Sequence, residues 1–426
     1  MIQNKNFSMD KKIDQYLFYL LLILSFLPIL YTLTVNILPS GTNRWGITEW
    51  LISYDGGFVR RGLTGELIKF LSITTRIAPT IIIVTITFVT FLIFTFFILK
   101  ITKDLVPKYV VLSPFLLGQA IFSTNMLRKD IFIMFLFFLC LQTLLSNLNK
   151  KFIFFLTNFI SVIGVLSHES YIFFCLPILI ISFNLLNNYG ALSVKGFLFF
   201  FIPLTAFLFV LFFKGTYHQA ELITESWNLI NNDIAKNYCC YDFPQGSIEA
   251  LSWSTAKNLS VTLDMIYTNY YGFISVPVVS FLSLCAGFFF IIKSIKSDKL
   301  KERNNFAQIF FIQTFFSLPI FIALDWGRWT IFILLTSLIA TTLLSKKIEL
   351  NFTSFFKKKL NFFTENNFVT KIFFIFFFSI PICCLNPTLY LVQTPAGSNF
   401  RALVYFFKPE YWFNFLSQSI GIFLNK

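Results

Sequence analysis

The chain has 426 residues, of which 56% are hydrophobic and only 13% are charged. Soluble domains have a much lower apolar fraction, so these values exclude an ordinary soluble globular protein and indicate a chain embedded in lipid. The formal net charge of +14 would suggest nucleic-acid binding in a soluble protein. Here it comes mainly from lysines between apolar segments, the charge distribution of a multi-span membrane protein.

Twelve apolar runs predict the membrane-spanning helices. The first, 16–35, is long enough to span and has no small-residue cleavage site, which predicts an anchor and not a removable leader. The last, 411–424, is short and either spans or lies in the interface. We therefore expect an all-α polytopic transmembrane helix bundle of about 11–12 spans, forming one membrane domain over residues 1–426. The runs are 16–35, 80–99, 109–122, 131–145, 152–166, 171–186, 197–213, 273–292, 306–323, 330–344, 372–385 and 411–424.

The positions of the cations predict the orientation. With a cytoplasmic N-terminus, most of the 34 Lys and Arg residues fall in cytoplasmic segments, including basic loops at 293–305 and 345–371. Seven of the eight arginines then lie on the extracytoplasmic side. Lysine already supplies the charge that orientation needs, so these arginines suggest planar bidentate donors for an anion. Contact with lipid phosphates is the alternative interpretation.

The first outer loop, 37–79, carries the densest group of candidate residues. From residue 54 it reads YDGGFVRRG, and we expect two short helices on either side of the glycine turn. Arg60 and Arg61 would enter the second helix, whose N-terminal amides favour a phosphate or pyrophosphate. Asp55 is a carboxylate near a cationic pair and hence a candidate general base. The alternative is a turn capped by Asp55, with both arginines on lipid headgroups.

Three further outer turns carry charge between closely spaced spans. Each is weak evidence alone, because a histidine at a helix end is often a cap and Asp325 could simply pair with Arg328. In a helical bundle, however, these turns would lie at one membrane depth and could meet. We therefore predict catalytic roles for Asp55, His168 and Asp325, and phosphate binding by Arg60, Arg61, Arg128, Lys129 and Arg328. Asp130 and Glu169 belong to the same group of outer charges.

The large outer loop, 214–271, is rich in aromatic residues. Apolar residues recur in it at helical spacing, which predicts an amphipathic helix on the outer leaflet. Its aromatic side chains could stack on sugar rings, or form an interfacial girdle. A disulfide between the Cys239–Cys240 and Cys383–Cys384 pairs is compatible with an oxidising periplasm. The helix residues are Leu222, Ile223, Trp227, Ile230 and Ile234, and the aromatic residues are Trp227, Tyr241, Trp253, Tyr267, Tyr270 and Tyr271.

This first outer loop, the large outer loop and the many spans resemble the GT-C superfamily of polyprenyl-linked sugar transferases, especially the bacterial O-antigen and capsule polymerases of the Wzy type. Motif-level similarity covers YDGGFVRRG and, more loosely, the DWGR segment that begins at Asp325. The resemblance implies that Asp55 serves as base or metal ligand and that outer arginines hold a lipid diphosphate. The chain lacks an acidic pair in the first outer loop and a Trp-Trp-Asp motif, so neither a metal nor another cofactor is indicated.

The resemblance implies a glycosyltransferase or polysaccharide polymerase that uses polyprenyl-(di)phosphate-linked glycans at the outer face of a bacterial inner membrane. Its partners would be these glycans, the bilayer and other polysaccharide-assembly proteins, but no nucleic acid. A lipid-linked glycan flippase or another transporter is the alternative, and a membrane scaffold is a third. Coupled transport is disfavoured, because the cores of the eleven firmer runs hold no Asp, Glu, Lys, Arg or His.

Overall fold

The computed structural model describes residues 44–102, 127–234, 243–268 and 326–347, with Tyr16, residues 313–315 and Ser317 as isolated positions. Every element in these residues is helical, which confirms the all-α class for this part of the chain. The number of spans stays a prediction. Apart from the isolated positions, six predicted spans lie outside the described residues, namely 16–35, 109–122, 273–292, 306–323, 372–385 and 411–424. The loop 293–305, most of the loop 345–371, Asp325 and the cysteines of the suggested disulfide lie outside them as well.

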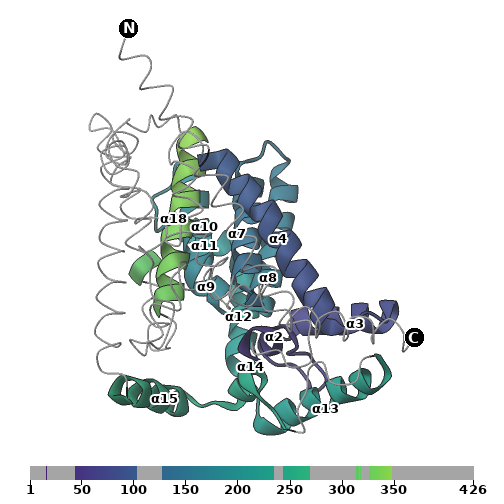
Figure 1. The fold of residues 1–426 in the computed structure, drawn as a ribbon. Helices are drawn as coiled ribbons and strands as arrows, with labels where there is room; N and C mark the ends of the chain where they lie inside the picture. Colours follow the sequence, from purple (N-terminus) through teal and green to yellow (C-terminus); the bar gives the residue numbers. More distant parts are fainter. Residues whose placement is uncertain are drawn as a thin grey trace.

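The long helices of the described part run side by side as a bundle (Figure 1). Two of them, α4 (Pro79–Thr102) and α8 (Lys150–Ser167), are long and apolar enough to cross a membrane. A third candidate is a pair of helices, Phe201–Phe212 and Tyr217–Ile230, bent by 100° between them. The shorter apolar helix α7 (Asp130–Leu145) packs against α4, as does α18 (Trp326–Lys347), whose apolar part is Arg328–Leu344. These features support a membrane protein.

Helix α8 has the side-chain distribution expected of a helix between lipid and protein. Phe152, Phe155 and Phe159 are more than half exposed and lie along one side. The opposite side presents small and polar residues to α7 and α12. A Cβ at Gly164 would lie 2.5 Å from the Tyr171 ring, so only glycine permits this close contact. The exposed phenylalanines therefore suit a lipid-facing surface.

Two predicted spans, 171–186 and 197–213, are each broken into two helices. The break after Phe174 is followed by Pro177, and the break at Phe200 is followed by Pro203. A proline in a helix lacks an amide donor and its ring clashes with the carbonyl four residues earlier, which explains both breaks. The four helices are α9 (Ser170–Phe174), α10 (Leu176–Leu186), α11 (Val194–Phe199) and α12 (Phe201–Phe212).

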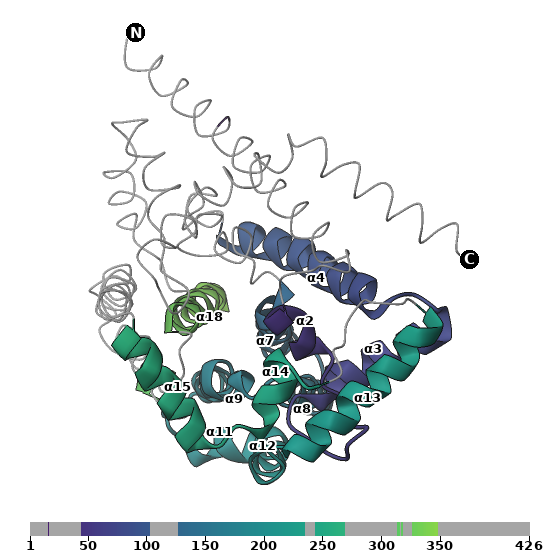
Figure 2. The same ribbon diagram turned by 60° about the horizontal axis from the view of Figure 1, so that its bottom comes forward.

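A second group of helices lies across one end of the bundle (Figures 1 and 2). We call this group the transverse layer. It confirms the two short helices predicted around the glycine turn, and a helix at the predicted place in the large outer loop. Its members are α2 (Arg44–Trp50), α3 (Gly62–Thr75), α13 (Tyr217–Ile234), α14 (Gly246–Glu249), the 3-10 helix η2 (Ala250–Ser252) and α15 (Thr255–Thr268).

The apolar side of α13 packs on protein, which corrects the prediction that it lies on the outer leaflet. Ile223 and Trp227 are fully buried, and the Trp227 indole donates a hydrogen bond to the Leu51 carbonyl at 2.6 Å. Trp227 thus cannot stack on a sugar ring. The buried side of this amphipathic helix packs on α14, on η2 and on the turn that follows α2, and that contact holds the loop that carries Asp55.

The glycine turn at Gly56 and Gly57 is in close contact with α13. A Cβ at Gly56 would lie 2.9 Å from the Gln219 backbone, and the Gln219 side-chain amide donates to the Gly56 carbonyl at 3.0 Å. Gly57 has a positive φ of 96°, which strongly favours glycine. The close backbone approach that the sequence predicted for a phosphate is therefore made by α13 of the same chain.

Candidate functional site

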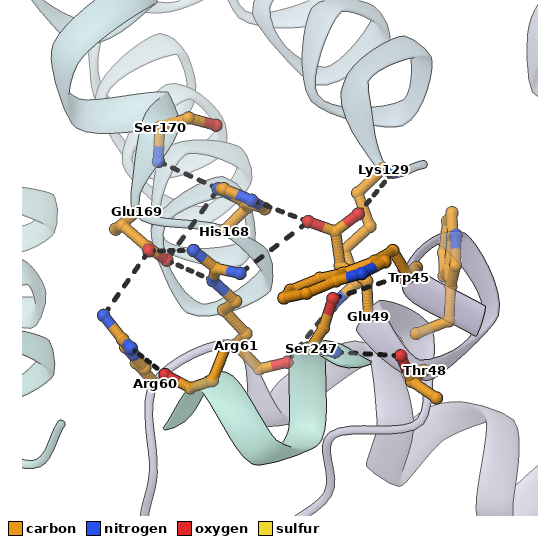
Figure 3. A network of polar contacts seen from close by, with 12 residues as sticks. Trp45, Thr48, Glu49, Arg60, Arg61, Lys129, His168, Glu169, Ser170 and Ser247 are labelled. Carbon is orange, nitrogen blue, oxygen red and sulfur yellow. Dashed lines mark hydrogen bonds and ion pairs between the residues drawn. The ribbon is translucent and has the colours of Figure 1, made fainter. Parts of the chain in front are cut away.

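A network of charged side chains lies where the transverse layer meets the bundle (Figure 3). The layer contributes one acid and two arginines, and the bundle contributes a lysine before α7 and a His-Glu pair between α8 and α9. The first outer loop and two of the three further charged turns, those at Lys129 and at His168, thus supply residues to one place. The members of this network are Glu49, Arg60, Arg61, Lys129, His168 and Glu169.

Glu49 and His168 form the buried centre of the network. Their side chains are 1% and 4% exposed, and His168 Nε2 donates a hydrogen bond to Glu49 Oε1 at 2.8 Å. The Ser170 backbone N–H donates to His168 Nδ1 at 3.1 Å. These partners define the tautomer, with the proton on Nε2 and the Nδ1 lone pair in use. His168 has no free lone pair here, which favours a positioning role over that of a base.

Burial and nearby charge set the ionisation of this pair. Burial lowers the pKa of His168, and the charge of Arg61 lowers it further, so His168 is neutral at pH 7. Burial alone would raise the pKa of Glu49, but the hydrogen bond from His168 and the charges of Arg128 and Arg328 hold it well below its usual range. The centre of the network is therefore a carboxylate bound by a neutral imidazole.

Arg61 joins this centre to Glu169. Its Nε donates to Glu169 Oε2 at 2.6 Å and its Nη2 pairs with Oε1, which makes a bidentate ion pair, while Nη1 lies 3.8 Å from Glu49 Oε1. Arg61 has a left-handed backbone, with φ 65°, immediately before α3. A non-glycine residue in this region is strained, and such strain persists only where the surroundings hold it.

Lys129 stabilises the left-handed backbone at Arg61. Its fully buried ammonium donates to the Arg61 carbonyl at 3.2 Å and to the Ser167 carbonyl at 3.1 Å. It also lies 5.8 Å from the centre of the Trp50 ring. Burial lowers the pKa of Lys129 to about 7, despite the opposing charge of Glu49. This arrangement departs from the predicted phosphate contact: Lys129 ties the Arg61 turn to the end of α8.

Arg60 is the least satisfied cation of the network. Its Nη2 donates to the Ala250 carbonyl at 2.9 Å, and its Nη1 lies 3.8 Å from Glu169 Oε1. Its Nε is buried and has no hydrogen-bond partner among the described residues. The side chains of Arg60, Arg61 and Glu169 are each about a fifth exposed, so the three form the accessible edge of the network.

Arg328 forms a separate ion pair beside the network. Its Nε and Nη2 each bond a carboxylate oxygen of Asp130 at 2.6 Å, and its guanidinium lies 4.8 Å from the Trp329 ring centre. The sequence had suggested Asp325 as its partner, but Asp325 lies outside the described residues. Arg128 lies close enough to Glu49 to lower the pKa of that carboxyl. Both arginines therefore add positive potential to the site.

Asp55 pairs with a lysine and two serines in the described part of the chain. It forms an ion pair with Lys69 and accepts hydrogen bonds from Ser53 at 2.5 Å and Ser226 at 2.7 Å. Its side chain is 25% exposed. Burial would raise its pKa, but the hydrogen bonds from Lys69 and the two serines lower it, so Asp55 is ionised at neutral pH. The cation that pairs with Asp55 is thus Lys69, whereas the sequence had suggested Arg60 and Arg61.

Two aromatic residues lie at the same end of the molecule. Trp45 is 41% exposed, and its ring meets Trp253 edge-on with centres 5.9 Å apart. Of the other aromatic residues suggested for sugar stacking, Tyr241, Tyr270 and Tyr271 lie outside the described residues, as does the side chain of Tyr267. Trp45 and Trp253 are therefore the described pair that suits a sugar contact.

Glu49 and Glu169 are the residues to which the sequence assigned no role. Glu49 lies in the apolar stretch Ile47–Ile52, where burial of an acid is unfavourable unless the acid is paired. An acid in such a segment was therefore the feature of the sequence that could have predicted a buried ion pair. No group of three His, Cys, Asp or Glu side chains in the described ranges is placed to hold a metal ion. In comparisons with protein-family models, curated proteins and solved structures, the chain matched none of them.

Proposed function

We propose that this protein is a membrane glycosyltransferase that acts as a polysaccharide polymerase. It joins polyprenyl-diphosphate-linked glycans at the extracytoplasmic face of a bacterial inner membrane. The observation that carries this proposal is the pair Arg60 and Arg61, which share one carboxylate at the end of the membrane-spanning helices. A planar, bidentate donor pair at this depth matches a lipid-linked phosphate, whose prenyl chain would remain in the bilayer.

The charge of the site supports an anionic ligand. Glu49, Glu169 and Asp130 are the acids among the paired groups, whereas Arg60, Arg61, Arg128 and Arg328 are all cationic and Lys129 adds to them when protonated. The site therefore carries surplus positive charge where two of its arginines are accessible. Such a surplus, partly shielded from water, favours a phosphate over a neutral ligand.

The chemistry requires few groups. An acceptor hydroxyl attacks the anomeric carbon of the donor sugar, the bond from that carbon to the phosphate oxygen breaks, and the electron pair stays on the diphosphate. Arg60 and Arg61 stabilise the charge that develops on this leaving group. Asp55, ionised and a quarter exposed, accepts the proton of the acceptor hydroxyl. His168 and Glu49 hold Arg61 in place.

A transporter is less well supported. It would need polar side chains free to line a path between the spans. The amide nitrogen of Asn158 bonds the Phe154 and Phe199 carbonyls, and that of Asn184 bonds the Ala191 and Ser193 carbonyls. Gln313 bonds the Phe174 carbonyl and two side-chain hydroxyls. The amides of Asn158 and Gln313 therefore join helices to one another, and that of Asn184 joins α10 to the loop before α11.

The test is polysaccharide gel analysis of a deletion strain complemented with single variants. Arg60→Ala, Arg61→Ala and Asp55→Ala should each abolish long chains while the protein still inserts in the membrane. Arg76→Ala is the matched control, because Arg76 is an exposed arginine with a left-handed backbone at the other end of α3. Wild-type chain lengths in all three site variants would refute the proposal.

A further inference from the structure

We propose that Glu169 competes with the lipid diphosphate for Arg60 and Arg61, so that binding requires its carboxylate to leave the two guanidiniums. This inference rests on the proposed function and adds that Glu169 lowers the affinity of the site for the lipid diphosphate. Its basis is geometric: the two Glu169 oxygens face Arg61 Nε and Nη2, the paired donors that would also receive two phosphate oxygens.

The position of Glu169 suits a side chain that moves. It lies in the short break between α8, which ends at Ser167, and α9, which begins at Ser170. A rotation of this side chain needs no change in either helix. Because it is about a fifth exposed, water or a ligand can reach it.

Among the described residues, displacement of Glu169 breaks one close ion pair. The other charged side-chain contacts of Glu169 in this part of the chain are an Arg60 nitrogen and His168 Nδ1, both at 3.8 Å. By contrast, Arg328 has the same bidentate geometry with Asp130 but is only 6% exposed and lies over the Trp329 ring. Of these two pairs, the Arg61 pair is the one that an incoming anion can replace.

Replacement of Glu169 by a diphosphate would give the two arginines more hydrogen-bond acceptors. Arg60 now reaches Glu169 only through a 3.8 Å contact and keeps a buried Nε without a partner in the described part of the chain. A diphosphate has more oxygens than a carboxylate and can accept from both guanidiniums together. The released Glu169 carboxylate turns toward water, where its charge is solvated.

The experiment measures the affinity of the full-length protein in detergent for farnesyl diphosphate and, in a second arm, for inorganic pyrophosphate. Glu169→Gln keeps the shape of the side chain but removes its charge. It should bind farnesyl diphosphate more tightly than wild type by about fivefold or more, since a charge-assisted pair no longer has to be broken. Glu66→Gln, at an exposed acid on α3 whose carboxylate accepts from the Tyr54 amide, is the control and should bind as wild type does.

The outcomes separate the inference from the proposed function. Wild-type binding with equal or weaker binding by Glu169→Gln would overturn the inference alone, because a purely structural acid does not compete. Absence of binding in both proteins would overturn the proposed function and the inference with it. Tighter binding of farnesyl diphosphate than of pyrophosphate by the wild-type protein identifies a lipid-linked ligand, and equal affinity for the two probes identifies a free one. If Glu169→Gln is not monodisperse, Glu169→Asp should give an intermediate gain.

Discussion

Two charged regions on the same end of this protein differ in how their charges are matched. In the network, two arginines share Glu169, so that this acid serves two cations, and Arg61 also approaches Glu49. At Asp55, one acid meets one lysine and two serine hydroxyls, and the charges balance locally. The first arrangement leaves positive charge available to an incoming anion, and the second does not.

The two regions also differ in what holds them. The network joins α2, the turn before α3, the turn before α7 and the junction of α8 with α9, so its geometry depends on contacts between distant segments. Asp55 depends on its own loop, α3 and α13. The network should therefore respond to mutation as a unit, while changes at Asp55 should stay local.

The largest expected effect is a loss of stability, and it tests whether the network responds as a unit. Glu49→Ala would leave the His168 Nε2 proton without its acceptor and remove an acid that offsets Arg61. Leaving a buried hydrogen-bond donor without its partner costs about 1–3 kcal/mol. We expect a clearly lower midpoint of thermal unfolding in detergent. Glu66→Ala, at an exposed acid, should change stability by less than about 0.5 kcal/mol. Equal midpoints for wild type and Glu49→Ala would show that the network is not cooperative.

An intermediate effect concerns pH. The pKa of Lys129 is about 7 in the folded protein against 10.5 for an ordinary lysine. Between these values the unfolded chain binds more protons than the folded one, so this residue makes stability rise with pH from about 7 toward 10. We expect the thermal midpoint to increase over this window, and Lys129→Met to flatten the increase. Lys195→Met, at an exposed lysine, is the control and should leave the slope unchanged.

Much of the described fold was predictable because its signals are local. A long stretch without charge predicted α4, and the glycine turn between two short amphipathic segments predicted α2 and α3. The breaks at Cys175 and Phe200 also had a local signal in Pro177 and Pro203, but apolar length alone cannot reveal them. The helix of the large outer loop was predictable, whereas the surface that it covers was not.

The site was predictable only as a group of residues. The charged outer turns predicted that their residues could lie together, since turns at one end of a bundle lie at similar depth, and Arg61, Lys129 and His168 belong to one network. Their partners could not be assigned: Arg61 and Glu169 are 108 residues apart, and His168 and Glu49 are 119 apart. Asp55 illustrates the same limit. Its neighbours in sequence suggested Arg60 and Arg61, but its ion pair is with Lys69, in the middle of α3.

The smallest effect on stability, and the sharpest test of the comparison, comes from the Asp55 region. A partly exposed ion pair contributes about 0–1 kcal/mol, so Lys69→Met should fold normally and bind farnesyl diphosphate within about twofold of wild type. Its effect should appear in the rate of glycan transfer as a function of pH. Lys69 lowers the pKa of Asp55, so its removal raises that pKa and moves the acidic limb of the pH profile to higher pH. Lys257→Met, on α15, should leave the limb in place. An unshifted limb in Lys69→Met would exclude Asp55 as the base and leave the network, which Lys69 does not contact, as the place to look for it.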